Sequence, residues 1–249
     1  MKFWSQLLGA FLMCSGVENT FGNTGDSVPI LKKEVRLKAT ARFHSLGMFN
    51  YGGVVGSVNP VSDFNLVLER PKWGVHLFKG IDLIERVSFY NSTLLSVFKS
   101  FKIIKKITIT PYVGVFLEQS HGFADPGSDV VCIITSTFKF SPHLSVEHMN
   151  LFGNLVIEPL QRDWVNRFRF IYTHRHLDVV PTLWYNSPVF DHSSRWSAGA
   201  NVAYSRMKVA EHISLSAGIT GLMVFTTRGE PEILRKSGLM FSLALQYTR

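Results

Sequence analysis

The sequence predicts an all-β protein, a closed antiparallel transmembrane barrel of about 12 strands. Beyond residue 34, apolar and polar residues alternate with a period of two in almost every segment, which is typical of strands with two unlike faces. Charged residues make up only 18% of the chain, clearly below the roughly 25% usual for soluble domains. Aromatic residues lie at strand ends on the same face as the aliphatic ones, as in the interfacial girdles of membrane barrels.

The chain begins with the layout of an export signal. Lys2 precedes a short, mostly apolar run that ends in small residues, so we expect a signal peptide and leader at residues 1–22. A short N-terminal segment follows at 23–34. Because no linker or low-complexity tract interrupts the remainder, residues 35–249 are expected to form a single barrel domain.

The two cysteines do not predict an internal disulfide. Cys14 lies inside the predicted signal, so cleavage would leave Cys132 as a single thiol. Lipidation of Cys14 is the alternative, although the preceding "FLM" lacks the small residue usual before a lipidated cysteine.

The net charge of +8 raises the question of nucleic-acid binding. A binding face needs clustered basic residues, and here Lys and Arg are spread among predicted strands and turns. Together with the expected export, this distribution argues against a nucleic-acid partner.

The first predicted strand, 35–44, has the pattern that later strands repeat. Its alternate residues from Val35 to Phe43 are apolar, and the residues between them are polar and mostly basic. Further strands are predicted at 63–69, 73–79, 87–98, 107–117, 129–140, 144–157, 164–173, 178–186, 196–205, 213–225 and 239–247. Within 144–157 the alternation changes phase near His148 and Met149, which predicts a β-bulge.

Short and long connections alternate along this series. Short ones are expected near 70–72, 99–105, 141–143, 174–177 and 206–211. Longer or more polar ones are expected near 47–62, 80–86, 119–128, 158–163, 187–195 and 228–237. With an even number of antiparallel strands, this alternation places the long loops at one end of the barrel and both termini at the other.

Period-two alternation alone fits either a membrane barrel, with its apolar face outward, or a soluble barrel, with that face inward. The polar faces favour the membrane barrel, because they are rich in Ser, Thr, Gly, Asn and single Arg residues. Most predicted strands are about ten residues long, enough to cross a bilayer at the usual tilt. The alternative is a soluble periplasmic lipid-binding or lipocalin-like barrel.

The last strand, in "SGLMFSLALQYTR" at 237–249, shows the two faces most clearly. Its apolar face is expected to contact lipid and comprises Leu239, Phe241, Leu243, Leu245 and Tyr247. Its other face is expected to line the lumen and includes Ser242, Gln246 and Thr248.

Taken together, these features resemble the outer-membrane β-barrel proteins of Gram-negative bacteria. In that class the last strand commonly serves as the assembly signal, and Lys236, Gly238, Phe241 and Leu243 fit its outline. The resemblance implies recognition by the barrel-assembly machinery, periplasmic termini, and contact with outer-membrane lipid and lipopolysaccharide. The chain departs from the pattern by ending in Thr248 and Arg249 rather than in an aromatic residue.

Basic residues on the polar faces are candidates for a function inside the barrel. The set comprises Arg36, Lys38, Arg42, Arg167 and Arg169. An arginine-lined interior would favour anions in a pore. Alternatively, these residues would pair with Glu69, Glu147 or Asp178 and fill a narrow lumen.

Hydrolytic chemistry has weaker support. Phospholipases and lipid A deacylases among outer-membrane barrels carry a His-x-Ser pair on one strand, because residues i and i+2 share a face. Here His148 has Asn150 in place of the serine, whereas His192 and Ser194 have the required spacing near a strand end.

No metal or cofactor is expected, since His174 and His176 occupy a predicted turn without further ligands nearby. A narrow pore or small-solute transporter is therefore the first functional hypothesis, a lipid-modifying hydrolase the second, and a structural or surface-interaction barrel the third.

Overall fold

The computed structural model describes residues 35–49, 52–71, 73–86, 88, 90–117, 129–153, 155, 163–188, 194–228 and 236–249. The predicted signal peptide and leader, the segment 23–34 and Cys14 lie outside these residues. No helix in the described ranges is both long and apolar enough to cross a membrane.

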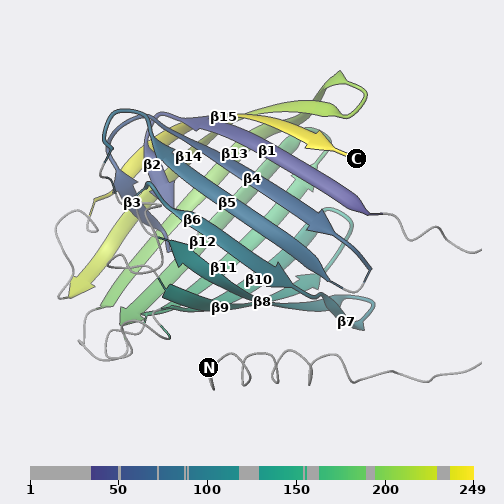
Figure 1. Ribbon diagram of the computed structural model, residues 1–249, viewed down its shortest axis with the longest axis horizontal. Helices are drawn as coiled ribbons and strands as arrows, with labels where there is room; N and C mark the ends of the chain where they lie inside the picture. The colour runs from purple at the N-terminus through teal and green to yellow at the C-terminus, as the bar shows by residue number, and fades with distance from the viewer. Residues whose placement is uncertain are drawn as a thin grey trace, which may run out of the picture. The chain divides into compact units, whose positions relative to one another are not determined.

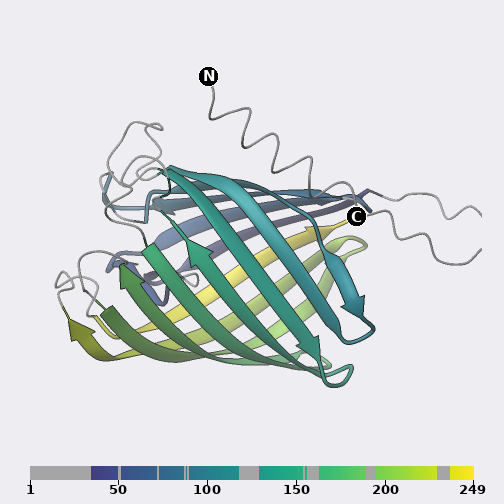
Figure 2. The ribbon, with the colours of Figure 1, turned by 90° about the horizontal axis from the view of Figure 1, so that it is seen from below.

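The barrel wall has 12 strand positions, and neighbours in the wall are neighbours along the chain (Figures 1 and 2). In order they are β1 (Arg36–His44), β4 (Val61–Glu69), β5 (Gly74–Asp82), β6 (Thr93–Phe98), β8 (Ile107–Leu117), β9 (Asp129–Lys139), β10 (Leu144–Phe152), β11 (Asp163–His174), β12 (Leu177–Pro188), β13 (Ser194–Ala210), β14 (Ile213–Arg228) and β15 (Gly238–Thr248). β15 pairs antiparallel with β1 and closes the ring. The predicted closed all-β barrel is confirmed.

Two further strands lie outside this series. β2 (Gly47–Phe49) and β3 (Val54–Ser57) form a hairpin within the loop between β1 and β4.

One wall position is shared by two strands. β7 (Phe101–Ile104) follows β6 after a break at Lys99 and Ser100, and the two pair with successive parts of β8. The predicted connection at 99–105 is therefore wrong for most of its length, because residues 101–104 continue the strand and the turn is formed by Lys105 and Lys106.

The predicted bulge in β10 is also wrong. β10 pairs with β9 and β11 without a shift of register. The phase change arises because Met149 and Leu151 face the lumen, where they join an apolar cluster, while His148 and Asn150 face outward. Register shifts occur instead between β13 and β14.

The two ends of the barrel differ as the loop lengths predict. Tight turns such as Arg175–His176 and Glu211–His212 lie at one end, together with both ends of the barrel chain, where Leu37 N–H donates to the Arg249 carbonyl at 2.7 Å. We call this the short-turn end, at the right in Figure 1, and the opposite end the long-loop end.

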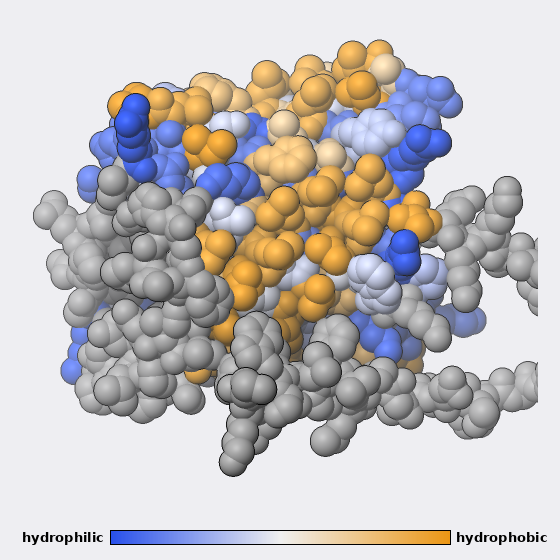
Figure 3. Space-filling model, viewed as in Figure 1, coloured by the Kyte–Doolittle hydropathy of each residue, from blue (hydrophilic) through white to orange (hydrophobic). Residues whose placement is uncertain are grey.

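The outer wall is apolar. Large hydrophobic side chains gather in a band across it, with hydrophilic ones towards both ends (Figure 3). On β15, Leu239, Phe241 and Leu243 are 59%, 54% and 49% exposed, whereas Met240 between them is 2% exposed. A soluble barrel would point this face inward, so the soluble alternative is wrong.

Candidate functional site in the barrel lumen

Asp63 on β4 is the centre of a buried polar cluster on one wall of the lumen. Its carboxylate accepts a hydrogen bond from Arg42 Nε at 2.7 Å and from Asn65 Nδ2 at 2.9 Å. Its second oxygen lies 2.9 Å from His44 Nε2 and 3.1 Å from the Tyr90 hydroxyl. These groups meet because Arg42 and Asp63 are directly opposite in the β1–β4 register, and alternate residues share a face.

Tyr90 belongs to the loop between β5 and β6, so this bond ties a loop to the wall. Burial and the neighbouring Asp63 carboxylate raise the pKa of the Tyr90 hydroxyl, which therefore stays protonated and donates its hydrogen. On the other side, His44 Nδ1 lies 2.7 Å from Ser242 Oγ on β15, which extends the cluster across three strands.

A second ionic cluster is built on β10 and β11. Glu147 lies directly opposite Arg169 in the register, and Arg167 is the next residue of β11 on the same face. Its Oε1 lies 3.0 Å from Arg167 Nη2 and 2.7 Å from Arg169 Nη2, and its Oε2 accepts from Arg169 at 2.8 Å. One carboxylate thus holds two guanidinium groups.

The two clusters face each other across the lumen. β1 and β4 are half a turn of the ring away from β10 and β11, and residues of both clusters line one cavity of about 290 Å³. The side chains of Asp63 and Glu147 are 2% and 11% exposed, while those of Arg42 and Arg169 are 30% and 28% exposed. The acids are buried in the wall, and the two arginines present positive charge to the cavity.

The hairpin of β2 and β3 folds into the barrel instead of lying outside it. Its Gly52 carbonyl accepts from Asn186 Nδ2 at 2.6 Å and from Arg195 Nη2 at 3.3 Å, and Ser197 Oγ donates to the Gly53 carbonyl at 3.2 Å. These donors come from β12 and β13 across the lumen, so the hairpin narrows the passage near the long-loop end.

Gly53 makes the close approach possible. Its φ of +59° lies in the left-handed region, and a Cβ atom there would be 2.4 Å from Cδ2 of Trp184 on β12. Only glycine combines this backbone angle with this contact.

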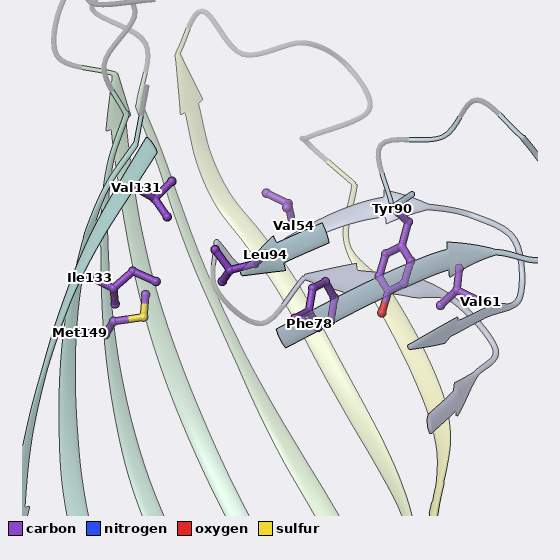
Figure 4. Packing of buried hydrophobic residues seen from close by; sticks show 8 residues of the cluster. All are labelled: Val54, Val61, Phe78, Tyr90, Leu94, Val131, Ile133 and Met149. Atoms are coloured by element: carbon purple, nitrogen blue, oxygen red, sulfur yellow. The ribbon is translucent and has the colours of Figure 1, made fainter. Parts of the chain in front are cut away.

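Apolar side chains complete the narrowing. Figure 4 shows Val131, Ile133 and Met149 on one wall and Phe78 and Leu94 on the other, with side chains directed into the space between. Val54 of the hairpin and Tyr90 of the β5–β6 loop belong to the same buried cluster.

The remaining predicted basic residues lie elsewhere. Arg36 and Lys38 share the face of Arg42, but they are exposed towards the short-turn end and do not line the cavity. Of the acids considered as their partners, Glu147 pairs with Arg167 and Arg169, whereas Asp178 pairs with Arg206 at 3.0 Å near a turn.

The structure brings no hydrolytic pair together among the residues it describes. His192 lies outside the described residues, and Ser194 begins β13 opposite Arg228. His148 faces outward with its ring stacked on Phe168 at 4.1 Å between centroids.

The residues of the predicted assembly signal lie at and just before β15. Lys236 precedes the strand, Gly238 begins it, and Phe241 and Leu243 are exposed on the outer wall. Among the described residues, no group of three or more His, Cys, Asp or Glu side chains is placed to hold a metal.

Several residues of the lumen were not predicted. Asp63 and Tyr90 organise one cluster together with His44, which the alternation of 35–44 does place on the polar face, and the hairpin of β2 and β3 supplies the narrowing. Asp63 stands in phase with Asn65, Val67 and Glu69, so a strand with one polar face would have placed it in the lumen. The hairpin has no comparable pattern, because its strands are three and four residues long.

No family model and no curated protein matches the chain. Among solved structures it is similar to the KdgM porin, with a TM-score of 0.56 and 10% identity over 84% of this chain and 98% of that one. The KdgM porin in complex with disordered oligogalacturonate gives 0.54 and 10% over 86% and 98%. The NanC porin gives 0.50 and 10% over 85% and 98%. The chain thus shares the β-barrel fold of these porins.

Proposed function

We propose that the protein is a narrow outer-membrane pore for small anionic solutes, with its short-turn end and both termini in the periplasm. The observation that carries the proposal is the difference in exposure within each ionic cluster. In both, the carboxylate is buried in the wall while an arginine, Arg42 or Arg169, faces the cavity.

This arrangement favours anions for an electrostatic reason. A solute in the cavity is nearer to the guanidinium groups than to the carboxylates behind them, and the surrounding wall screens charge less than water does. Two cations on opposite walls attract an anion from both sides, whereas a cation meets repulsion from both.

The internal hairpin limits the size of the solute. It is fixed to β12 and β13 by hydrogen bonds from Asn186, Arg195 and Ser197, and it lies where the apolar cluster narrows the lumen. A passage bounded in this way suits small solutes better than folded macromolecules.

The membrane and its assembly machinery are the partners that this proposal requires. Lys236, Gly238, Phe241 and Leu243 would be read by the barrel-assembly machinery, and the apolar outer wall would contact lipid and lipopolysaccharide.

Conductance in planar bilayers tests the proposal. We expect discrete channel openings whose reversal potential in a KCl gradient shows a preference for chloride. Arg169→Gln should reduce that preference severalfold, while Arg169→Lys, which keeps the charge, should retain most of it. Heat-modifiable migration on a gel confirms that each variant is folded. A folded barrel without conductance at several voltages would show that the lumen is closed and that the barrel has a structural role.

A further inference from the structure

The tip that joins β6 to β8 differs from the other tight turns at the short-turn end. Its sequence, "KSFKIIKK" at residues 99–106, combines lysines with large apolar side chains. Ile103 and Ile104 are 59% and 54% exposed, and Lys105 and Lys106 beside them are exposed as well. We call residues 99–106 the basic tip.

Neighbouring residues enlarge this surface. Lys139 N–H donates to the Lys106 carbonyl at 2.8 Å, which places the end of β9 beside the tip. Phe140 next to it is 54% exposed. No acidic residue occurs in the chain between Glu85 and Glu118, so the segment itself contributes only positive charge.

Two cation–π contacts show how cations and aromatic rings are arranged here. Lys99 Nζ lies 4.9 Å from the centroid of Phe101, and the Arg70 guanidinium lies 5.3 Å from that of Trp73. Phe101 and Trp73 belong to neighbouring parts of the wall at the short-turn end. Cations thus lie beside the aromatic rings where the apolar band ends, at the level of a membrane interface.

Two other tight turns at this end lack this combination. Arg175–His176 and Glu211–His212 contain no large apolar side chain, and Arg206 near them is paired with Asp178. The basic tip, together with Arg70 and Trp73 on the neighbouring part of the wall, is therefore a surface that these two turns do not share.

We propose that the basic tip binds the phosphodiester headgroups of anionic glycerophospholipids in the leaflet around the short-turn end. Lys99, Lys105 and Lys106 contact the phosphates, while Ile103 and Ile104 enter the boundary of the acyl chains. Basic residues at a membrane surface attract anionic lipid, and apolar side chains beside them add affinity that a soluble anion cannot gain. The proposal concerns the outer wall and holds whether or not the lumen conducts.

Native mass spectrometry of the folded barrel in detergent tests the proposal. With equal amounts of phosphatidylglycerol and phosphatidylcholine, we expect several-fold more retained phosphatidylglycerol. The triple variant Lys99→Gln, Lys105→Gln, Lys106→Gln should lose this preference. A matched variant in the long connections, Arg86→Gln, Arg228→Gln, Arg235→Gln, removes the same charge and should keep the preference.

Two further measurements separate lipid from other anions. Ile103→Ser with Ile104→Ser should lower retention of phosphatidylglycerol while leaving all charges in place, and 10 mM inorganic phosphate should displace little of the bound lipid. Equal retention of the two lipids by the unaltered barrel, or equal losses in the tip and long-loop variants, would overturn the proposal. Full displacement by inorganic phosphate would do so too, because it would identify a site for free anions.

Discussion

The two charged walls of the lumen use the same kind of ion pair for different purposes. On the β1–β4 wall, Asp63 is bound by Arg42, Asn65, His44 and Tyr90, and it joins two strands to a loop. On the β10–β11 wall, Glu147 is bound by Arg167 and Arg169, which both lie on the adjacent strand β11.

The two walls differ in which groups would lose their hydrogen-bond acceptor if the carboxylate were removed. Without Asp63, several buried donors and a loop would lose their common acceptor. Without Glu147, the buried Arg167 would lose this acceptor, whereas Arg169 is already open to the cavity. We infer that the Asp63 wall mainly supports the architecture, and that the Glu147 wall mainly sets the charge of the passage.

Removing each carboxylate in turn is the most severe test of this contrast. Asp63→Ala should lower the free energy of unfolding by about 3–5 kcal/mol, because it leaves the buried His44 and Tyr90 side chains and the Arg42 guanidinium without their common acceptor. Glu147→Ala should cost less, about 1–2 kcal/mol, and should increase the preference for anions. Urea unfolding followed by tryptophan fluorescence measures both. Equal losses would show that the two walls have the same role.

A charge on the outer face tests whether the wall is oriented as described. Leu243→Asp places a carboxylate in lipid and should impair insertion, at a cost of up to about 3 kcal/mol. Ser242→Asp, one residue away, faces the lumen beside His44 and should be tolerated. The measurement is the heat-modifiable fraction in isolated membranes. If both variants inserted normally, β15 would not have the faces assigned to it.

The internal hairpin provides a test at the level of one methyl group. Gly53→Ala forces a Cβ atom against Trp184 at a positive φ and should cost about 1–3 kcal/mol. We expect displacement of the hairpin and a higher single-channel conductance. Gly52→Ala is the control, since a Cβ atom there would lie 3.7 Å from Nδ2 of Asn186, which is ordinary van der Waals contact. Unchanged conductance in Gly53→Ala would mean that the hairpin does not limit the passage.

The smallest effect is expected for the ion pair outside both clusters. Arg206 and Asp178 have side chains that are 44% and 22% exposed. Arg206→Gln should therefore change stability by only about 0.5 kcal/mol, and the chloride preference should stay the same. A marked change in selectivity would place the selective step at the short-turn end and away from the two walls.

Period-two alternation, the composition of the polar faces and the alternating lengths of the connections together were sufficient to predict the closed barrel and the difference between its two ends. Each strand has lipid on one side and a polar lumen on the other, so each strand carries the pattern by itself. β10 shows where this reasoning fails. Met149 and Leu151 are apolar but face inward, because they pack in an apolar cluster inside the barrel, and alternation cannot distinguish this from a bulge.

The lumen could be predicted only in part. Arg42, Arg167 and Arg169 follow from their phase within amphipathic strands. Which acids pair with them depends on the register between strands, and the path of the hairpin depends on bonds to β12 and β13 more than 130 residues away. Such contacts leave no periodic mark in the sequence.

The bond between His44 and Ser242 has a consequence for how the barrel forms. It joins residues 198 positions apart, so it cannot exist until nearly the whole wall has been built. Phe241 N–H donates to Ser45 Oγ at 2.9 Å at the same seam. A slip of one residue would turn Ser242 towards lipid and Leu243 towards His44. The hydrogen bonds at this seam therefore form only in the correct register, so the pairing of the first and last strands stabilises only the correctly closed barrel.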